Sequence, residues 1–338
     1  MISLFEESTM IKRCTGCGAV LQQDDKEHIG YTKDLSLDQC ERCFRIAHYG
    51  DYQVVTKDNA DYLNILKTIQ QTKDLVIFVV DLFNLNQEVY ALAKQIHNPC
   101  LLVLTKRDLF ASDIHDEKFT SYLANLPLNI IDQVLISSKN NTGYDELYEK
   151  IQRHQRSNHV YVVGLTNAGK STMINQLFHH YSKRDCEITT SNLPSTTIDM
   201  LPLPFSETLT IIDTPGILDH SITGVIDANL LKRITPKKTI RPITYQIKVK
   251  QSIIIDKLLR IDVTPVNSVT CYFANNLPFN RYYKEIDQLS TLQKHILEVP
   301  ANSDVLIAGL GFIKIVKASR IVVYTLPNVE VSVRKALI

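Results

Sequence analysis

Short, unbroken apolar runs alternate with amphipathic stretches between about residue 60 and residue 215. The expected strands are Leu75–Asp81, Cys100–Thr105, Gln133–Ser137, His159–Gly164 and Leu209–Ile212. The expected helices are Gln87–Ile96, Ser112–Leu126, Tyr144–His154 and Lys170–Tyr181. Apolar strands that alternate with helices predict an α/β fold, with a parallel sheet and helices on both of its faces.

After Gly216 the pattern changes to short alternating stretches rich in Val, Ile, Thr and Tyr. One helix is expected at Gly224–Ile234, and turn residues such as Pro278 and Gly309 separate the stretches that follow it. The expected strands are Ile243–Val249, Ser252–Ile255, Leu258–Val263, Ser268–Phe273, Val305–Ala308, Ile313–Val316 and Arg320–Tyr324. This part of the chain therefore predicts a mostly β domain.

Residues 1–50 are polar and show little apolar periodicity, so this segment needs a stabilising cross-link, such as a metal or disulfides, in order to fold. The longest apolar run, Leu75–Val80, is far shorter than the ~20 residues that span a bilayer. The first residues carry Glu6 and Glu7 and have no long apolar core, so no signal peptide is expected. A cytoplasmic location is the resulting expectation.

The formal net charge of +1 conceals an uneven distribution of charge along the 338 residues. Residues 221–338 hold 17 Lys and Arg against 8 Asp and Glu, whereas acidic residues predominate before them. A basic last third favours the binding of RNA or another polyanion. A solvated basic surface explains the same charge and remains an alternative. The candidate RNA contacts are Lys232, Arg233, Lys237, Lys238 and Arg241.

The segment Gly164-Leu-Thr-Asn-Ala-Gly-Lys-Ser171 matches the phosphate-loop pattern GxxxxGK[ST], between an expected strand and an expected helix. Its glycines let backbone N–H groups turn toward phosphate oxygens, and the helix directs its positive end at the anion. Lys170 is expected to reach the β- and γ-phosphates, and Ser171 to bind Mg²⁺. The expected nucleotide contacts are Gly164, Asn167, Ala168, Gly169, Lys170, Ser171 and Thr172.

The segment Asp213-Thr-Pro-Gly216 follows an apolar strand and stands about 40 residues after the phosphate loop. Asp213 is expected to hold Mg²⁺ through water, and the N–H of Gly216 to contact the γ-phosphate. Between the two motifs, Pro194-Ser-Thr-Thr197 offers Thr196 and Thr197 as Mg²⁺ ligands, of which Thr197 is preferred. An ordinary loop threonine is the alternative.

The segment Thr105-Lys-Arg-Asp108 ends an expected strand and is similar to the guanine-reading motif NKxD of GTP-binding proteins. The carboxylate of Asp108 can accept from the N1–H and 2-amino groups of guanine, whereas adenine has no N1 proton. Lys106 is expected to pack its stem along the base. After the next strand, Ser137-Ser138-Lys139 is similar to the SAK motif that lies behind the guanine. A surface turn is the alternative for Thr105–Asp108.

The guanine-reading motifs precede the phosphate loop, which is the reverse of their order in ordinary GTPases. A circular permutation explains this order. The site stays intact because a parallel sheet brings all of these segments to its carboxyl edge, where ligands bind. The fold expected is therefore a circularly permuted P-loop GTPase domain.

Four of the seven cysteines form two CxxC pairs, Cys14–Cys17 and Cys40–Cys43, separated by 22 residues. Four thiolates suit tetrahedral Zn²⁺, and a structural zinc would stabilise a segment that has almost no core. A redox pair or disulfides are the alternatives. Cys100, Cys186 and Cys271 are expected to be ordinary thiols.

With its zinc segment CTGCG…CERCFRIAHYGDY, its permuted motifs and its ending GLGF…VSVRKALI, the chain resembles the YqeH-type circularly permuted GTPases. The resemblance covers nearly all of the chain. It implies a GTPase that assists assembly of the small ribosomal subunit and contacts rRNA through its C-terminal domain. The expected units are a zinc-binding segment, 1–55, a GTPase domain, 56–222, and a basic, mostly β domain, 223–338.

Several residues depart from the usual GTPase motifs. Thr105 replaces the Asn of NKxD, with the expected loss of an amide that contacts guanine and braces the phosphate loop. Ile217 stands where Ras-like proteins carry a water-orienting Gln. Asn167 matches the Asn that helps to hold K⁺ in potassium-dependent relatives, so slow hydrolysis, faster in K⁺ than in Na⁺, is expected. The expected catalytic residues are Lys170, Asn167, Thr197 and Gly216.

The favoured hypothesis is a GTP-hydrolysing switch on the ribosome, with GTP or GDP, Mg²⁺, Zn²⁺ and K⁺ as its expected ligands. A metabolic phosphoryl-transfer enzyme would need a small-substrate motif, and none is present. A nucleotide-sensing RNA-binding scaffold without hydrolysis is the remaining alternative.

Overall fold

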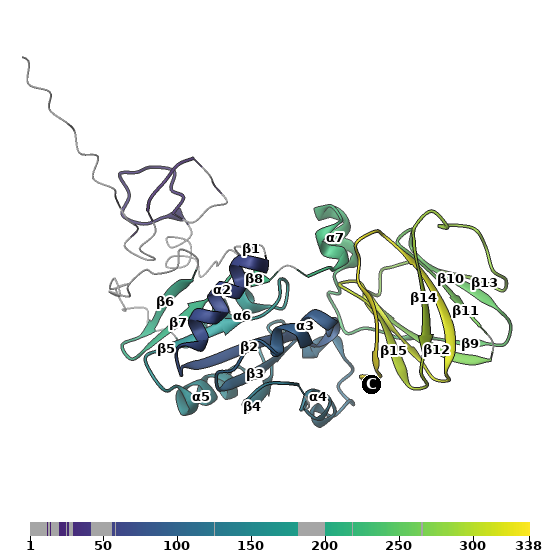
Figure 1. The fold of residues 1–338 in the computed structure, drawn as a ribbon, viewed down its shortest axis with the longest axis horizontal. Helices are drawn as coiled ribbons and strands as arrows, with labels where there is room; N and C mark the ends of the chain where they lie inside the picture. Colours follow the sequence, from purple (N-terminus) through teal and green to yellow (C-terminus); the bar gives the residue numbers. More distant parts are fainter. Residues whose placement is uncertain are drawn as a thin grey trace, which may run out of the picture.

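The computed structural model describes residues 12, 14, 20–24, 26, 30–41, 56–57, 59–124, 126–181, 200–217, 219–264 and 266–338. Its larger parts are an α/β domain and, beside it, an all-β C-terminal domain (Figure 1). In the part of the chain described, no helix is long and apolar enough to cross a membrane.

The α/β domain is built on one six-stranded sheet in the order β4-β3-β2-β5-β7-β6. The strands are β2 (Leu75–Asp81), β3 (Cys100–Thr105), β4 (Ile130–Leu135), β5 (His159–Val163), β6 (Leu201–Ser206) and β7 (Leu209–Asp213). Five of them are parallel, but β6 pairs with β7 in the antiparallel direction. The expectation of an all-parallel sheet is therefore wrong at this edge. Pro202 and Pro204 lie on the edge strand β6, where a missing N–H is tolerated.

Alternate residues of the central strand β2 enter two different cores. Val76, Phe78 and Val80 pack under α2 (Asn59–Gln70), α3 (Gln87–Ala93) and α4 (Asp116–Leu123). Leu75, Ile77 and Val79 pack on the other face, under α5 (Tyr144–His154) and α6 (Lys170–Tyr181). Burial on both faces explains why the strand is a continuous apolar run, as the sequence indicated.

Two differences from the expected helices have clear causes. Helix α2 was not among them, although Tyr62, Ile65, Leu66 and Ile69 have helical spacing and are buried. The single helix expected at Gly224–Ile234 is wrong. A short 3-10 turn, Ile222–Gly224, precedes α7 (Ala228–Ile234), because Asp227 caps the new helix by accepting from two backbone N–H groups.

The C-terminal domain is a sandwich of two antiparallel five-stranded sheets. One sheet has the order β13-β10-β11-β17-β14, with β10 (Gln251–Ile255), β11 (Leu259–Val263), β13 (Phe279–Tyr282), β14 (Gln293–Val299) and β17 (Ser319–Thr325). The other has the order β18-β15-β16-β12-β9, with β9 (Ile243–Ile247), β12 (Asn267–Phe273), β15 (Ser303–Ile307), β16 (Gly311–Ile315) and β18 (Val331–Lys335). A mostly β domain is confirmed.

An apolar interface joins the sandwich to the α/β domain. Leu306, Phe312 and Leu337 lie in the same buried cluster as Phe83 and Phe110. The rings of Phe83 and Phe312 are 5.8 Å apart between centroids. Intervening residues of β15 and β16 point instead into the core of the sandwich. This sheet is therefore buried on both faces, and the two domains share one continuous core.

Arg334 forms a buried polar contact at this interface. Its guanidinium pairs with Asp304 at 3.4 Å and donates to the carbonyl of Leu85 at 3.2 Å. We expect Arg334→Met to lower the free energy of unfolding by about 3–5 kcal/mol, because it leaves a buried carboxylate without its ion-pair partner. Urea unfolding measures the change. The exposed Arg320→Met is the control and should stay within about 0.5 kcal/mol of the parent. Equal losses in both variants would contradict the prediction.

Candidate functional site

The ends of four neighbouring strands bring the sequence motifs to one edge of the sheet. Strand β2 ends at Asp81, β3 at Thr105 and β7 at Asp213, and β5 leads directly into the phosphate loop. The short strand β8 (Gly216–Ile217) continues the Asp213 motif beside that loop. The carboxyl edge of a parallel sheet is where ligands bind in this class of fold.

The phosphate loop has a backbone that its glycines permit. Gly169 has a φ of +99°, and Asn167, which tolerates this region better than most residues, has a φ of +58°. A Cβ on Gly164 would lie 2.5 Å from the carbonyl oxygen of Val79, so only glycine fits where β5 passes β2. Helix α6 begins at Lys170, with Ser171 and Thr172 in its first turn.

Lys170 is only 5% exposed and lies inside the loop that it follows. Its ammonium donates to the carbonyls of Gly164 at 2.8 Å and Leu165 at 2.9 Å. Burial lowers the pKa of Lys170 to about 7. A phosphate at this position would favour the charged form of the lysine and raise that pKa.

Gly216 lies directly against the phosphate loop. A Cβ at this position would come within 2.9 Å of Thr166 Cγ2 and 3.1 Å of Lys170 Nζ. The carbonyl of Ile217 accepts from the N–H of Thr166 at 2.8 Å, which fixes the two segments together. Asp213 is 5% exposed at the end of β7. The structure thus brings Gly216 and Lys170, two of the expected catalytic residues, into contact.

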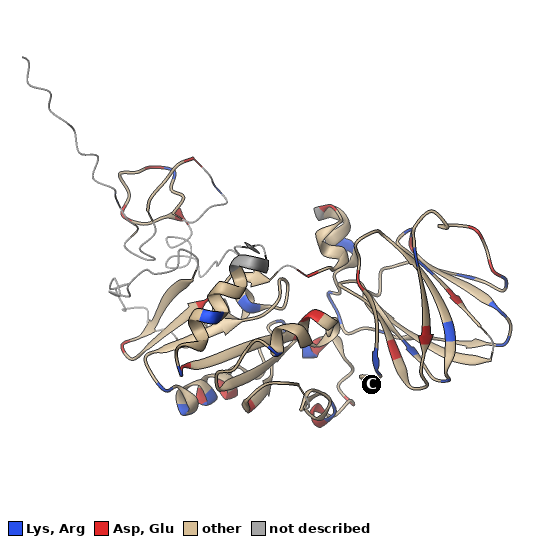
Figure 2. Ribbon diagram, in the orientation of Figure 1, with Lys and Arg blue, Asp and Glu red and all other residues tan. Residues whose placement is uncertain are grey.

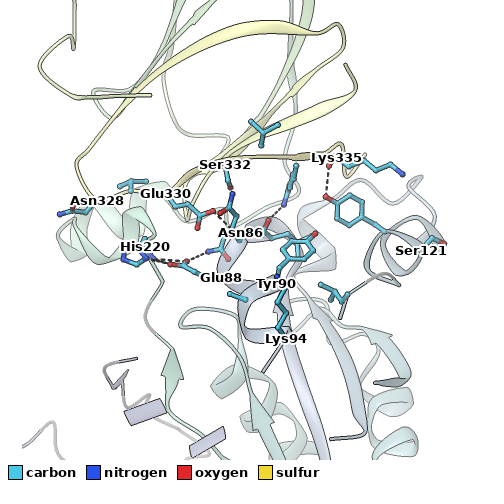
Figure 3. A pocket seen from close by; sticks show the side chains of 18 residues that line it. Asn86, Glu88, Tyr90, Lys94, Ser121, His220, Asn328, Glu330, Ser332 and Lys335 are labelled. Carbon is cyan, nitrogen blue, oxygen red and sulfur yellow. Dashed lines mark hydrogen bonds and ion pairs between the residues drawn. The ribbon is translucent and has the colours of Figure 1, made fainter. Parts of the chain in front are cut away.

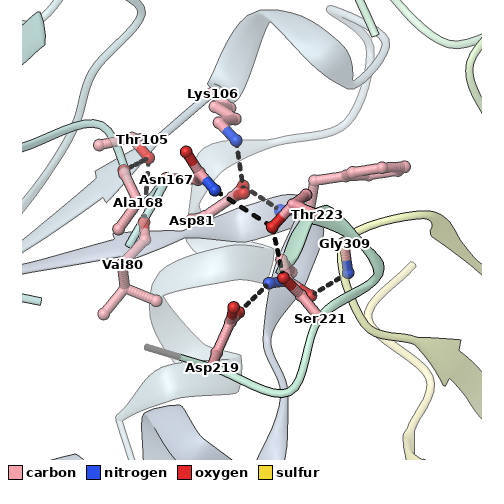
Figure 4. A network of polar contacts seen from close by, with 12 residues as sticks. Val80, Asp81, Thr105, Lys106, Asn167, Ala168, Asp219, Ser221, Thr223 and Gly309 are labelled. Atoms are coloured by element: carbon pink, nitrogen blue, oxygen red, sulfur yellow. Dashed lines mark hydrogen bonds and ion pairs between the residues drawn. The ribbon is translucent and has the colours of Figure 1, made fainter. Parts of the chain in front are cut away.

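Thr105 braces the phosphate loop, so the loss of that brace inferred from the missing Asn is wrong. Its hydroxyl donates to the carbonyl of Ala168 at 2.7 Å (Figure 4). The side chain is buried, and its Cγ2 lies 3.4 Å from where a Cβ of Gly169 would be. A hydroxyl placed by the end of β3 thus spans the gap without the longer amide.

The two segments expected to read guanine contact each other. Asp108 accepts from the hydroxyl of Ser137 at 2.7 Å, and the hydroxyl of Ser138 lies 2.6 Å from that of Tyr144. Lys106 has a φ of +62° and donates to Asp81 at 2.6 Å. Asp81 was not among the expected site residues. Its signal in the sequence is the same as that of Asp213, a carboxylate at the end of a buried strand.

A chain of polar contacts leads from the phosphate loop to Ser221, which packs against the C-terminal domain (Figure 4). The amide of Asn167 donates to the hydroxyl of Thr223 at 3.2 Å, and Ser221 lies 2.6 Å from that hydroxyl. Gly309, in the β15–β16 turn, fits against Ser221, where a Cβ would lie 2.9 Å from the serine Cβ. Thr223 and Ser221 belong to no motif, so no signal in the sequence could have identified them.

The structure describes the expected zinc and magnesium sites only in part. Thr196, Thr197, Cys17 and Cys43 lie outside the described residues. Cys14 and Cys40 are both 1% exposed, and the N–H of Cys40 donates to the sulfur of Cys14 at 3.2 Å. No cluster of three or more metal-ligating side chains occurs among the described residues.

A cavity of about 1020 Å³ lies away from these motifs, between α3, α4 and β18 (Figure 3). Glu88 and His220 form an ion pair on its wall. Burial raises the pKa of Glu88, and the contact with Glu88 raises the pKa of the His220 imidazole. The groove follows the domain interface and contains none of the expected nucleotide-binding residues.

The basic candidates for RNA contact lie on α7 and on the segment that joins it to β9. Among them, Lys232, Lys237, Lys238 and Arg241 are exposed, and Arg233 pairs with Asp256. Lys and Arg also recur on the outer end of the sandwich (Figure 2). The basic part of the sequence is therefore spread over one domain.

A phosphate loop, an adjoining Asp-Thr-Pro-Gly turn and a segment similar to NKxD on one sheet edge are typical of a P-loop GTPase. Residues 159–256 match the family model described as a 50S ribosome-binding GTPase. The YqeH protein of Bacillus subtilis is 31% identical over 96% of this chain and 99% of its own length. The chain belongs to the YqeH-type GTPase family and is a GTP hydrolase.

Two further relatives match at lower identity. NO-associated protein 1 of Arabidopsis thaliana, a chloroplastic/mitochondrial protein, is 25% identical over 91% of this chain and 70% of its own length. GTPase Der of Mycoplasma mycoides subsp. mycoides is 29% identical over 45% of this chain and 36% of its own length.

The lowered pKa of Lys170 predicts that nucleotide binding takes up a proton. At pH 8 the free lysine is mostly neutral, whereas phosphate holds it charged, so GTP binding should take up nearly one proton. The affinity for GTP should fall as the pH rises above 7. Titration calorimetry at pH 8 in buffers of different ionisation enthalpy measures the uptake. Uptake that is absent at pH 8, or equally large at pH 6, would contradict the prediction.

The brace at Thr105 predicts a difference between two close variants. Thr105→Val keeps the shape but loses the donor to Ala168, so GDP affinity should fall about 3–10-fold. Thr105→Ser keeps the hydroxyl and should stay within about twofold of the parent. Fluorescence titration with a labelled GDP measures both. Equal affinities of Thr105→Val and the parent would exclude the brace.

Proposed function

We propose that this GTPase is a guanine-nucleotide switch that assists assembly of the small ribosomal subunit and binds its rRNA. The observation that carries the proposal is the contact of Asn167 with Thr223, because it joins the phosphate loop to a segment that is docked on the C-terminal domain. The description of the matching family model, a 50S ribosome-binding GTPase, supports a ribosomal setting, and the basic C-terminal third agrees with an RNA partner.

The segment from Asp219 to Val225 is well placed to transmit the nucleotide state. The N–H of Ile222 donates to the carbonyl of Ala308 at 2.8 Å, and the N–H of Glu330 donates to that of His220 at 2.8 Å. We call residues 219–225 the strap, because hydrogen bonds fix them to the sandwich. GTP that orders Gly216 and the residues around Thr197 would therefore act on the strap. Ordering of a segment by the γ-phosphate is a general device of GTPase switches.

The proposed nucleotide contacts divide into a phosphate side and a base side. On the phosphate side, Lys170 and the N–H of Gly216 would face the γ-phosphate, while Ser171, Asp213 and Thr197 would serve Mg²⁺. On the base side, Asp108 would accept from guanine, backed by Ser138 and Lys139. The contact of Ser137 with Asp108 supports this assignment, because it orients the carboxylate.

A circular permutation accounts for the motif order. Helix α5 ends at His154 and β5 begins at His159, so a short connection joins the guanine-reading half of the domain to the phosphate loop. Strands β3 and β5 flank β2 in the sheet although the motif order along the chain is reversed. A permuted chain with an unchanged site would have this arrangement.

We propose Zn²⁺ at Cys14, Cys17, Cys40 and Cys43. The described pair supports this, because both sulfurs are buried, and an amide-to-sulfur hydrogen bond of 3.2 Å is suited to stabilising a thiolate. The zinc would supply the folding free energy that a segment with almost no apolar core lacks.

We propose K⁺ beside Asn167. In the contact with Thr223 the carboxamide uses its nitrogen, so its oxygen is the atom suited to a cation. A bound K⁺ would neutralise charge that develops on the phosphates, where Ile217 offers no group to orient water.

Co-sedimentation with ribosomal subunits tests the proposed function. With a non-hydrolysable GTP analogue we expect preferential pelleting with small subunits, and less pelleting with GDP or without nucleotide, at fixed salt. Asn167→Ala should pellet equally with GTP analogue and GDP, because it cuts the contact to Thr223. Preferential pelleting with large subunits, which would agree with the name of the matching family model, would refute the proposed partner. Pelleting that ignores nucleotide would refute the switch.

A further inference from the structure

The segment that links α7 to the sandwich lies directly on the guanine-reading loops. The hydroxyl of Thr239 donates to the carbonyl of Asp108 at 2.8 Å, and the N–H of Ile240 donates to that of Leu109 at 2.8 Å. The ammonium of Lys139 donates to the carbonyl of Lys237 at 2.6 Å. Three bonds from residues 237–240, which we call the linker segment, thus reach both base-reading motifs.

The linker segment is also fixed on its other side, by the sandwich. Asn275 donates from its side chain to the carbonyl of Thr239 at 2.9 Å and accepts from the N–H of Arg241 at 2.8 Å. Ile240 is 5% exposed and lies in the apolar cluster that holds Leu109 and Phe110. Thr239 is therefore tied through its hydroxyl to the α/β domain and through its carbonyl to the sandwich.

These contacts act on the backbone that positions Asp108. The residue lies in a short turn, Arg107–Leu109, entered through Lys106 in a left-handed conformation. The hydrogen bond from Thr239 to the Asp108 carbonyl, and the one from Ile240 to the Leu109 carbonyl, limit how this turn can move. The direction of the Asp108 carboxylate, and hence its fit to the edge of guanine, depends on that backbone.

We propose that the linker segment is a positioning element of the guanine site, so that docking of the C-terminal domain sets the affinity for guanine. By linkage, a guanine nucleotide then favours the docked domain by the same factor. This inference rests on the proposed base-reading roles of Asp108 and Lys139. The inference adds residues 237–240 to the guanine site. These residues lie outside the α/β domain and belong to no GTPase motif.

Thr239→Val removes the hydroxyl that donates to Asp108 and keeps the shape of the side chain. Thr235→Val is the matched control, because the exposed Thr235 donates only within the end of α7, to Leu231 at 2.7 Å. We expect Thr239→Val to weaken GDP binding about 3–10-fold, and Thr235→Val to leave it unchanged. Equal GDP affinities in the two variants would overturn the proposal. Thermal unfolding establishes that both variants are folded.

Inosine diphosphate separates guanine positioning from general loosening, because hypoxanthine lacks the 2-amino group that Asp108 would read. Thr239→Val should weaken inosine diphosphate binding less than GDP binding, and so lower the preference for GDP. Equal weakening of both ligands would overturn the positioning role.

Asp108→Asn tests the base-reading assumption separately. It should shift preference from GDP toward xanthosine diphosphate, whose 2-oxo group accepts from an amide. If Asp108→Asn shifts the preference and Thr239→Val behaves like Thr235→Val, only the inference fails. If Asp108→Asn does not shift it, the proposed guanine site fails, and the inference with it.

Discussion

The apolar contact between the α/β domain and the sandwich is the constraint on which the rest of the structure depends. Phe312 and Leu337 complete a core that begins with Phe83 and Phe110, so separating the domains would expose apolar surface on both of them. The polar contacts at the interface are ordered because this core fixes the distance between the domains. Among them are the Arg334–Asp304 pair and the strap around Thr223.

That docking gives the nucleotide site two connections to the C-terminal domain. On the phosphate side, Asn167 leads through Thr223 to the turn at Gly309. On the base side, Asp108 leads through Thr239 to Asn275. The two connections reach neighbouring turns of one sheet of the sandwich, because β12 ends at Phe273, which pairs with Gly311 at the start of β16. This arrangement suits a protein in which one domain binds the nucleotide and the other meets a large partner.

The sequence predicted the elements that repeat a strong local pattern. Helices α5 and α6 have the expected bounds, because their apolar spacing and flanking residues define both ends. The sequence did not predict β6, because Pro202 and Pro204 are unusual in a strand and are tolerated there only at a sheet edge. It also did not predict β14, because the exposed Lys294 and Glu298 make its apolar alternation weak. Edge strands receive less burial from their neighbours, so their sequences carry less of the signal.

By itself the sequence determined the fold class and the positions of the phosphate loop and the base-reading motif, because these depend on glycines, a lysine and carboxylates at fixed local spacing. Only the tertiary structure decided which partners these residues meet. Thr105 bonds Ala168 across 63 residues, and Thr239 bonds Asp108 across 131. A threonine hydroxyl can pair with any nearby carbonyl, so its partner follows from the packing of strands and domains rather than from the pattern around it.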